Sequence, residues 1–331
     1  MMESAAPQQP ERRFDLVALG ESMLSLSPVP GTATFSYDIA GAESNVARNV
    51  AALGLRAGWV SRIGGDVAGP LVHAAIADGG VDTGDVAVTG DAPTGLMLKG
   101  APGTEPRVQY YRRGSAASGM STSNIDVAGC LDTAVVHLTG ITPALSESCR
   151  ALVFELLDSP SPAIRSFDVN WRPALWSAAA SAADVLADAA NRSDVVFVGL
   201  DEAEAVWDLS TPADVRGLID RPRWLVVKNG AEDVTTFVDD VAHTEPALRG
   251  TVVDPMGAGD AFAAGYLTGI VRHPDDVRRC QRLGHITAMS AVTSHNDVGR
   301  PMSWDRIERL LALPPDEWAV VHYPDGAIDA G

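Results

Sequence analysis

A single aspartate near the end of the chain follows a glycine-rich turn, and the two together could carry out chemistry. Residues 254–260 read DPMGAGD, which predicts a buried strand at 251–253, a glycine loop and an amphipathic helix starting at Asp260. Backbone N–H groups at the positive end of a helix bind anions, and Gly257 and Gly259 leave room for an anion to approach. A carboxylate beside the anion can take a proton from a hydroxyl group. The turn therefore favours phosphoryl transfer to an alcohol.

The same residues also have an ordinary structural explanation. A strand, a glycine turn and a helix with an acidic first turn form a common arrangement, and G-x-G-D alone is a weak signal. Here the motif continues into the small residues AFAAG at 261–265. The functional hypothesis therefore depends on whether other suitable residues accompany the turn.

Polar side chains that could bind a sugar and a phosphate accompany two further elements. Gly41 opens a predicted helix that carries Asn45, whose amide could bond a sugar hydroxyl; a capped helix end is the alternative. Asp168 and Asn170 end a predicted strand and can point to one side, where phosphate, metal and water could be held. Arg172 follows with a planar guanidinium that matches a carboxylate or a phosphate.

A basic and aromatic cluster reads YYRRGSA at 110–116. On an exposed edge strand its aromatic residues would be surface groups without a function. The tyrosine hydroxyls and arginines of this string, taken together with Arg172, would instead suit a carboxylated substrate. A neutral hexose does not need that much positive charge.

Apolar strand-like runs alternate with helical stretches along the chain. The predicted strands are 14–20, 58–63, 134–138, 164–169, 195–198, 224–228 and 235–238, and the predicted helices are 44–54, 70–79, 146–157, 178–190, 260–270, 278–294 and 303–313. This alternation predicts an α/β fold with a doubly wound, mainly parallel sheet flanked by helices. The candidate residues fall at the carboxyl ends of strands, where such sheets bind ligands. The stretches 23–38 and 94–113 hold short alternating runs that predict antiparallel strands outside this sheet.

Composition limits the classes of protein to which the chain could belong. Its 331 residues are 46% hydrophobic, which is enough for one large domain at 14–313. Residues 1–13 predict a disordered tail without a targeting signal, and residues 314–331 predict a second tail. The net charge of −18 makes nucleic acid and anionic membranes poor partners, and no apolar run is long enough to span a bilayer. The scattered cysteines suit a reducing cytoplasm.

The strings around Tyr110, Arg172 and Asp260 jointly resemble the ribokinase-like (phosphofructokinase-B) sugar kinases, and most of all the 2-keto-3-deoxygluconate kinases among them. Those kinases carry Y-Y-R-x-G-S-A, D-P-N-x-R-P-x-L-W and a D-T-x-G-A-G-D box in this order. The resemblance implies ATP-dependent phosphorylation of the terminal hydroxyl of 2-keto-3-deoxygluconate, with Mg²⁺ and, as in many relatives, K⁺. It also implies that 23–38 and 94–113 form a small β-sheet lid through which the protein forms a homo-oligomer.

The resemblance assigns a role to each candidate residue. The catalytic residues are Asp260 and the N–H groups of Gly257, Ala258 and Gly259. The substrate-binding residues are Gly41, Asn45, Tyr110, Arg112, Arg172 and Asp260. The nucleotide-binding residues are Lys228, Gly230, Gly257, Gly259, Asp201 and His285. The metal-binding residues are Asp168, Asn170 and Glu204 for Mg²⁺, mostly through water, and Asp254 for a monovalent cation.

The chain departs from the family pattern mainly on the nucleotide side. Asp201 replaces the asparagine of an N-x-x-E motif, and Asp233, His285 and Asn296 replace residues that are usual near the nucleotide. The chain also has no G-x-x-x-x-G-K-[ST] loop, so backbone N–H groups, arginines and metal must hold the nucleotide.

Two other functions stay open at this point. A fructokinase, or another neutral-sugar or nucleoside kinase of the same family, would not need Arg112 and Arg172. A catalytically silent sugar-binding protein would not need Asp260 together with Gly257 and Gly259. The sequence also leaves open which epimer of the sugar acid is used and which oligomer forms.

Overall fold

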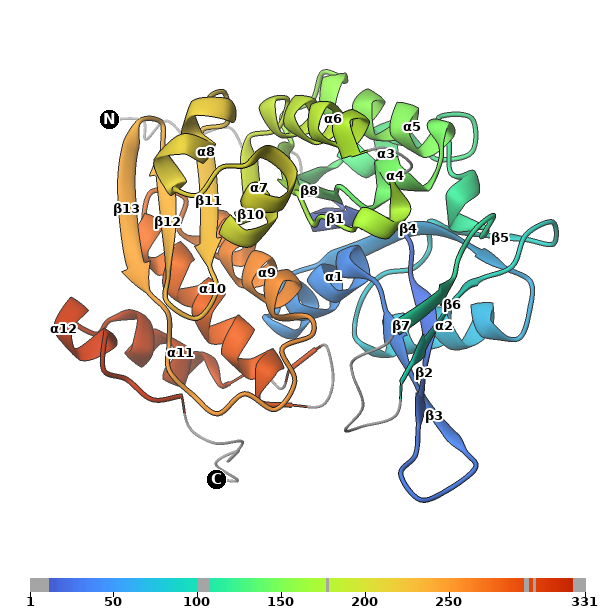
Figure 1. Cartoon of the computed structure of the whole chain (residues 1–331), viewed down its shortest axis with the longest axis horizontal. Helices are drawn as coiled ribbons and strands as arrows, with labels where there is room; N and C mark the ends of the chain where they lie inside the picture. The colour runs from blue at the N-terminus through green and yellow to red at the C-terminus, as the bar shows by residue number, and fades with distance from the viewer. Residues whose placement is uncertain (1–11, 101–107, 177–178, 295–297, 300–301, 324–331) are drawn as a thin grey trace, which may run out of the picture.

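The computed structural model describes residues 12–100, 108–176, 179–294, 298–299 and 302–323. Within them, nine strands form a central sheet of order β13-β12-β11-β10-β9-β8-β1-β4-β5 (Figure 1). Its strands are β1 (Phe14–Leu19), β4 (Ala57–Gly64), β5 (Val86–Thr89), β8 (Thr133–Thr139), β9 (Ile164–Asp168), β10 (Val195–Gly199), β11 (Trp224–Asn229), β12 (Asp233–Val238) and β13 (Val241–Pro246). Neighbours are parallel from β5 through β11, whereas β12 and β13 each run antiparallel to the strand before them. The predicted mainly parallel sheet is confirmed.

Helices cover both faces of this sheet (Figure 1). One face carries α1 (Ala42–Ala52), α2 (Ala68–Asp78), α9 (Ala258–Arg272) and α10 (Val277–Val292). The other face carries α3 (Val127–Leu131), α5 (Glu147–Asp158), α6 (Ala179–Asn191), α7 (Leu200–Trp207) and α8 (Pro212–Leu218). The predicted α/β class with helices on both faces is therefore confirmed. Each predicted helix and strand that the structure contains begins and ends within two residues of its predicted bounds. The sequence analysis missed the strands β5 and β13 and the helices α3, α4 (Thr142–Leu145), α7 and α8.

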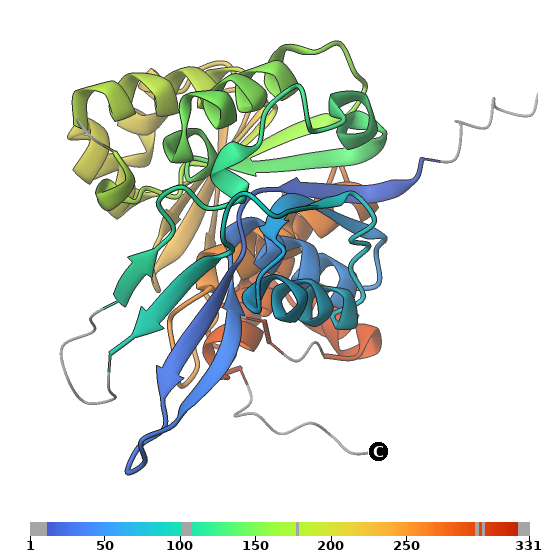
Figure 2. The same cartoon turned by 90° about the vertical axis from the view of Figure 1, so that its right-hand side faces the viewer.

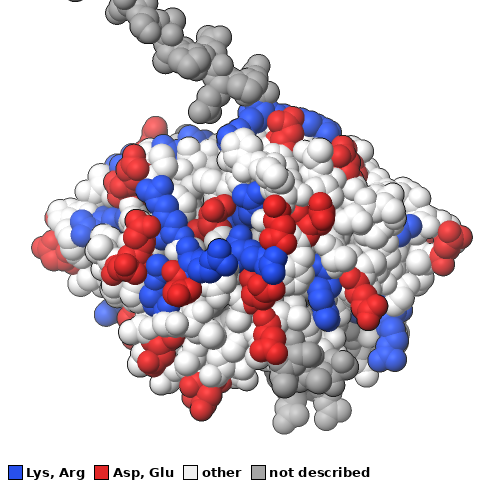
Figure 3. All heavy atoms as spheres, turned by 90° about the horizontal axis from the view of Figure 1, so that it is seen from above, with Lys and Arg blue, Asp and Glu red and all other residues white. Residues whose placement is uncertain are grey.

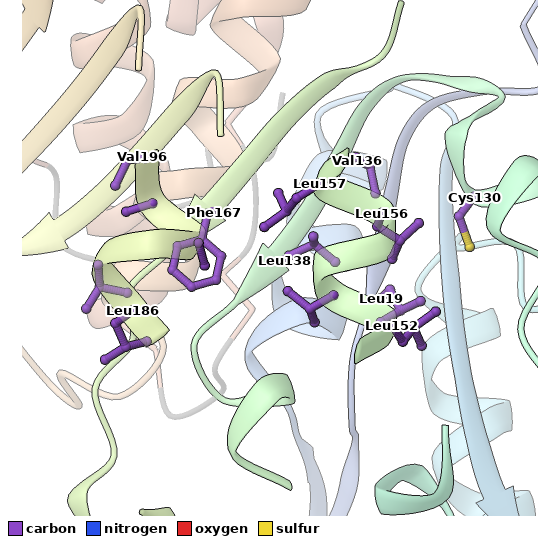
Figure 4. Packing of buried hydrophobic residues seen from close by; sticks show 14 of the residues in the cluster. Leu19, Cys130, Val136, Leu138, Leu152, Leu156, Leu157, Phe167, Leu186 and Val196 are labelled. Carbon is purple, nitrogen blue, oxygen red and sulfur yellow. The ribbon is translucent and has the colours of Figure 1, made fainter. Parts of the chain in front are cut away.

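The packing of α5 shows how the apolar pattern fixes these layers. Leu152 and Leu156, one turn apart on α5, are fully buried in the same cluster as Val136 and Leu138 of β8 (Figure 4). Burying one such side chain stabilises the fold by about 1.5–3 kcal/mol. This packing holds β8 in position, and the end of β8 carries Thr139, which contacts the candidate site.

A second sheet of four strands projects from the main body (Figure 2). Its order is β3-β2-β6-β7, with β2 (Met23–Pro28), β3 (Phe35–Ala40), β6 (Gly95–Lys99) and β7 (Val108–Tyr111). We call it the lid sheet. The pairs β2–β3 and β6–β7 are antiparallel as predicted, but β2 and β6 pair in parallel. A turn at Gly20–Ser22 joins β1 of the main sheet directly to β2, so the lid sheet starts where a central strand ends.

The predicted strand at 251–253 is wrong. Val252 and Val253 are 56% and 47% exposed and belong to a loop. The N–H groups of Val253 and Asp254 donate to the carbonyl of Val292 at the end of α10, at 2.7 and 3.2 Å. The last carbonyls of a helix lack hydrogen-bond donors within the helix. The two loop N–H groups bind one of these carbonyls and therefore do not join the sheet. The loop is thereby anchored to α10 just before α9 begins.

Part of the predicted C-terminal tail folds against the domain. After α11 (Trp304–Leu311), residues Pro315–Trp318 form the short helix α12. Trp318 is fully buried, and its Nε1 donates to the carbonyl of Pro246 at 2.9 Å. The part of the predicted tail up to residue 323 therefore packs on the domain, whereas the predicted tail at 1–13 lies almost wholly outside the described residues.

Positive and negative side chains are intermixed on the face that carries α5, α6 and α8, at the top of Figure 1. Figure 3 shows Lys and Arg side chains interspersed with Asp and Glu there. A mixed face of this kind does not offer the continuous basic stripe that nucleic-acid binding requires. None of the described helices combines the length and the apolar character that crossing a membrane requires.

We expect two buried histidines to make the fold less stable in acid. Burial lowers the pKa of His137 on β8 and of His285 on α10 to about 4, whereas a histidine in the unfolded chain titrates near 6.5. Between these values the unfolded chain binds protons that the folded chain does not, so stability falls as the pH falls from about 6.5 to 4. At pH 5 each histidine therefore lowers the free energy of unfolding by about 2 kcal/mol relative to neutral pH.

Denaturant unfolding of His137→Gln and His285→Gln at pH 7 and pH 5 measures this cost. The fall in the free energy of unfolding from pH 7 to pH 5 should be about 2 kcal/mol smaller in each variant than in the wild type. The exposed His243→Gln is the control and should keep the pH dependence of the wild type. Equal losses in all four proteins would contradict the assignment.

Candidate active site

The glycine turn and the first turn of α9 lie where the sequence analysis predicts an anion-binding loop. Gly257 is the N-cap residue of α9, and its φ of 77° lies in the left-handed region that glycine adopts readily. The N–H of Ala258 donates to the carbonyl of Pro255 at 3.3 Å. The first N–H groups of a helix have no partners within the helix and lie at its positive end. Asp260, which is 9% exposed, lies in this same first turn.

Two asparagine amides hold the carboxylate of Asp260. Asn45 Nδ2 donates to Asp260 Oδ2 at 2.9 Å, and Asn170 Nδ2 donates to Asp260 Oδ1 at 3.4 Å. All three residues are buried, and Asn170 has a φ of 41°, a sparsely populated conformation that often marks a functional site. The helices α1 and α9 lie side by side (Figure 1). The fold thus brings together three residues that the sequence analysis selected separately.

The N-terminus of α1 is fixed against the turn that leads into the lid sheet. A Cβ atom at Gly41 would lie 2.7 Å from the backbone carbonyl oxygen of Glu21, which cannot rotate away, so this position requires glycine. Glu43 is fully buried, and its Oε1 accepts a hydrogen bond from Thr139 Oγ1 at 2.7 Å. Burial raises the pKa of Glu43, against the effect of this hydrogen bond. These contacts fix the helix turn that carries Asn45.

A lysine and an aspartate form an ion pair at the ends of β11 and β9. Lys228 Nζ lies 3.2 and 3.3 Å from the two carboxylate oxygens of Asp168, whose side chain is 2% exposed. Burial opposes the charge of Lys228, but the carboxylates of Asp168 and Glu202 outweigh it and raise the pKa of the lysine. A Cβ atom at Gly259 would lie 3.6 Å from this ammonium group. The lysine therefore places a positive charge beside the anion-binding loop.

Glu202 is a site residue that the sequence analysis did not select. Its Oε1 accepts from the N–H of Trp171 at 2.8 Å, and its Oε2 accepts from the N–H of Gly199 at 2.9 Å. Burial raises its pKa, and the positive charge of Lys228 opposes this shift. Arg172 Nη1 lies 4.0 Å from Glu202 Oε1. A glutamate at the third position of a helix is a capping signal, and this was the clue in the sequence.

The lid sheet places a cation near helix α1. Arg112 follows β7, its side chain is 9% exposed, and its Nε donates to Glu21 Oε2 at 2.6 Å. Its charge also acts on the carboxyl group of Glu43 in α1. The guanidinium carbon lies 5.9 Å from the ring centroid of Tyr110, which is 46% exposed. The two predicted lid residues therefore lie together on the side of α1.

Other predicted residues lie apart from this group or at its margin. Asp201 and Glu204 are exposed on α7, and Gly230 is exposed in the β11–β12 turn. The side chain of Arg172 is 48% exposed. His285, in contrast, is buried between the rings of Phe262 and Trp318. Asp254 lies in the loop before α9, where its Oδ1 accepts from the N–H of Met256 at 2.9 Å. Asn296 lies outside the described residues. Across the described part of the chain, no three His, Cys, Asp or Glu side chains converge on a common metal position.

This arrangement suits the transfer of an anionic group to a hydroxyl. Asp260 is a carboxylate held by two amides, so it can accept a proton from a hydroxyl at a defined position. The start of α9 and the ammonium of Lys228 stabilise negative charge next to it. The lid adds a partly buried arginine, Arg112.

Comparison with known proteins identifies the family. A sequence model described as pfkB family carbohydrate kinase matches residues 14–303. The 2-dehydro-3-deoxygluconokinase of Bacillus subtilis (strain 168) is 34% identical over 292 residues, which cover 82% of this chain and 89% of that protein. The 2-dehydro-3-deoxygluconokinase of Thermoproteus tenax is 33% identical over 320 residues, with 93% and 97% covered. The crystal structure of a PfkB protein from Polaromonas sp. JS666 matches with a TM-score of 0.79 at 31% identity, covering 91% of this chain and all of that one. The chain therefore belongs to the pfkB family of carbohydrate kinases.

Proposed function

We propose that the protein transfers the terminal phosphoryl group of ATP to the terminal hydroxyl of 2-keto-3-deoxygluconate. The observation that carries this proposal is the combination of Asp260, in the first turn of α9 after the glycine turn, with a lid arginine, Arg112, whose side chain is 9% exposed and lies near α1. Two relatives at about one-third identity, which align over most of their length, are named for this activity. Both points support a sugar acid over a neutral sugar and an enzyme over a silent binding protein.

In this proposal Asp260 takes the proton from the attacking hydroxyl. Asn45 and Asn170 keep its carboxylate in one orientation, and the N–H groups of the loop from Gly257 bind the phosphoryl group as charge develops on its oxygens. Lys228, held by its own ion pair, adds positive charge at this point. The nucleotide phosphates then extend away from the loop on the side of β11.

The sugar acid is bound between α1 and the lid sheet. Gly41 and Asn45 contact its hydroxyl groups, while Arg112 and Tyr110 from the lid and Arg172 from the core loop contact its carboxylate. A carboxylate that leaves water for a closed site needs charged or hydrogen-bonding partners. The arginines supply them, whereas a neutral sugar offers no charge for the arginines to bind.

Mg²⁺ enters this scheme as part of the MgATP substrate. Asp168 is already paired with Lys228, and Glu204 is exposed. The described residues hold no cluster of ligands that would bind a metal alone. Phosphate oxygens and water therefore supply most of the Mg²⁺ ligands, with Asp168 and Asn170 acting through water.

We expect a monovalent cation to activate the enzyme. Asp254 uses one carboxylate oxygen to bind the N–H of Met256, and its second oxygen and the loop carbonyls are the donors that K⁺ prefers. Pro255 and Met256 supply carbonyls but no hydroxyl ligand. Initial rates in potassium chloride should exceed those in tetramethylammonium chloride at the same ionic strength. Equal rates in the two salts would remove the cation from the scheme.

The lid sheet also offers a surface for a second copy of the chain. Phe35, Tyr37 and Tyr111 are 54%, 57% and 58% exposed on it, and exposed aromatic residues are enriched at protein interfaces. We propose a cytoplasmic homo-oligomer that forms through this sheet. Sedimentation velocity of the wild type and of Tyr37→Ser tests it, and a wild-type protein that stays monomeric at micromolar concentration would refute it.

A screen with the purified protein tests the proposed reaction. ADP release with MgATP is measured for 2-keto-3-deoxygluconate, its galacto epimer, fructose, ribose and a nucleoside. The proposal predicts the highest rate with one of the keto acids, and NMR of the product should show phosphorus coupling at the terminal carbon. Release of ADP with fructose or the nucleoside only would support the neutral-sugar alternative.

A further inference from the structure

A buried glutamate lies at the point where the main sheet continues into the lid. Glu21 belongs to the turn Gly20–Ser22 between β1 and β2, and its side chain is completely buried. A carboxylate in such a position needs a charged partner. Its partner is Arg112, at the end of the lid strand β7, whose Nε and Nη2 both bind Glu21 Oε2. The ion pair therefore links the beginning of the lid sheet to the end of its last strand.

The geometry of this pair leaves part of the guanidinium for another ligand. A guanidinium has two edges that a carboxylate can approach, one formed by Nε and Nη2 and the other by Nη1 and Nη2. Glu21 occupies the first edge. Among the described residues, no hydrogen bond or ion pair reaches Nη1, and the ring of Tyr110 lies near the guanidinium plane. The second edge is thus oriented by contacts on the first.

We propose that Glu21 is a positioning residue for recognition of the substrate carboxylate by Arg112. It fixes the rotamer of Arg112 before the substrate binds, so the binding step does not have to order a long, flexible side chain. It also lets the buried cation exist in the sugar-free protein without an unpaired charge. This inference rests on the proposed function, because it needs a carboxylated substrate.

The test is the kinetics of Glu21→Gln, which keeps the shape and a hydrogen-bond acceptor but removes the charge. The KM for 2-keto-3-deoxygluconate should rise about tenfold, the loss of roughly one charge-assisted hydrogen bond. The kcat and the KM for ATP should stay within about twofold, because the phosphoryl-transfer loop is not touched. Glu21→Asp keeps the charge with a shorter reach and should fall in between, which gives a second variant if Glu21→Gln folds poorly.

Two controls separate positioning from a loss of stability. Glu245→Gln removes another buried carboxylate that accepts from an arginine Nε, that of Arg282 at 2.7 Å, far from the lid in sequence and in sheet order. It should lower the melting temperature without a change in the KM for the keto acid. In an Arg112→Leu background, Glu21→Gln should raise this KM no further, since a positioning residue acts only through its partner.

Each outcome decides the inference. A lower KM in Glu21→Gln would mean that Glu21 competes with the substrate, and an unchanged KM would mean that it has no role in binding; both overturn the proposal. A tenfold rise that persists in the Arg112→Leu background would also overturn it. If the wild type does not phosphorylate the keto acid at all, the proposed function fails first, and the role of Glu21 falls with it.

Discussion

Asp260→Asn should lower kcat by about two to four decades, because removal of a general base usually costs that much. The amide that replaces the carboxylate has nearly the same shape, so it can still fill the space next to Asn45 and Asn170. It cannot take a proton from the attacking hydroxyl. Single-turnover kinetics with saturating MgATP and keto acid measures the loss in the chemical step directly, and KM for both substrates should change little.

The matched control for this variant is Asp305→Asn. Asp305 also lies in the first turn of a helix, α11, but its side chain is exposed and, among the described residues, makes no hydrogen bond or ion pair with the candidate site around Asp260, Asn45 and Asn170. It should retain the activity of the wild type. A kcat for Asp260→Asn within a few-fold of the wild type, with the circular dichroism spectrum preserved, would remove Asp260 from the role of base.

Loss of one of the two arginines should impair the keto acid selectively. A hydrogen bond to a charged group contributes about 1.5–3 kcal/mol, so Arg172→Leu or loss of Arg112 should lower kcat/KM for 2-keto-3-deoxygluconate by roughly 10- to 150-fold. A neutral sugar has no carboxylate, and its use should change far less. Steady-state kinetics on the keto acid and on fructose, for each variant, measures the difference.

The structure determines how the Arg112 variant should be made. Arg112→Leu alone would leave the buried carboxylate of Glu21 without its cation, which commonly costs about 3–5 kcal/mol of stability. Arg112→Leu should therefore also be combined with Glu21→Gln, so that lost binding is not mistaken for lost folding. Arg113→Leu, at the next and exposed position, is the control for a simple change of charge. If both substrates lose activity equally, the arginines serve ATP or the fold, and the sugar-acid assignment loses its physical basis.

Local patterns were sufficient to predict the elements of the main sheet. The alternation of apolar strands and amphipathic helices depends only on burial at a fixed period, so the central strands and most helices could be placed within two residues. The short β5 and the exposed β13 carry weaker apolar patterns, and they were missed. The prediction for residues 251–253 failed for a different reason. Two valines imply a buried strand, but the N–H groups of Val253 and Asp254 donate to the carbonyl of Val292 at the end of α10.

The candidate site was predictable where its residues carry a sequence motif. Asp260, Asn45 and Asn170 each follow or open a recognisable element, and the fold brings them together although Asn45 and Asp260 are 215 positions apart. Glu21 carries no such signal, and Glu202 carries only a general helix-capping signal that does not point to a site. Each is an ordinary acidic residue in the sequence, and its importance arises only from a contact that the tertiary fold creates, with the N–H of Trp171 in one case and with Arg112 in the other.

The preference between an acid sugar and a neutral sugar is the most direct test of this account. The measurement is kcat/KM for 2-keto-3-deoxygluconate and for fructose with one preparation of the wild-type protein and saturating MgATP. Because each of the two arginines should favour the carboxylate by at least about tenfold, the account predicts a preference of about 100-fold or more for the keto acid. Equal values, or a preference for fructose, would contradict it.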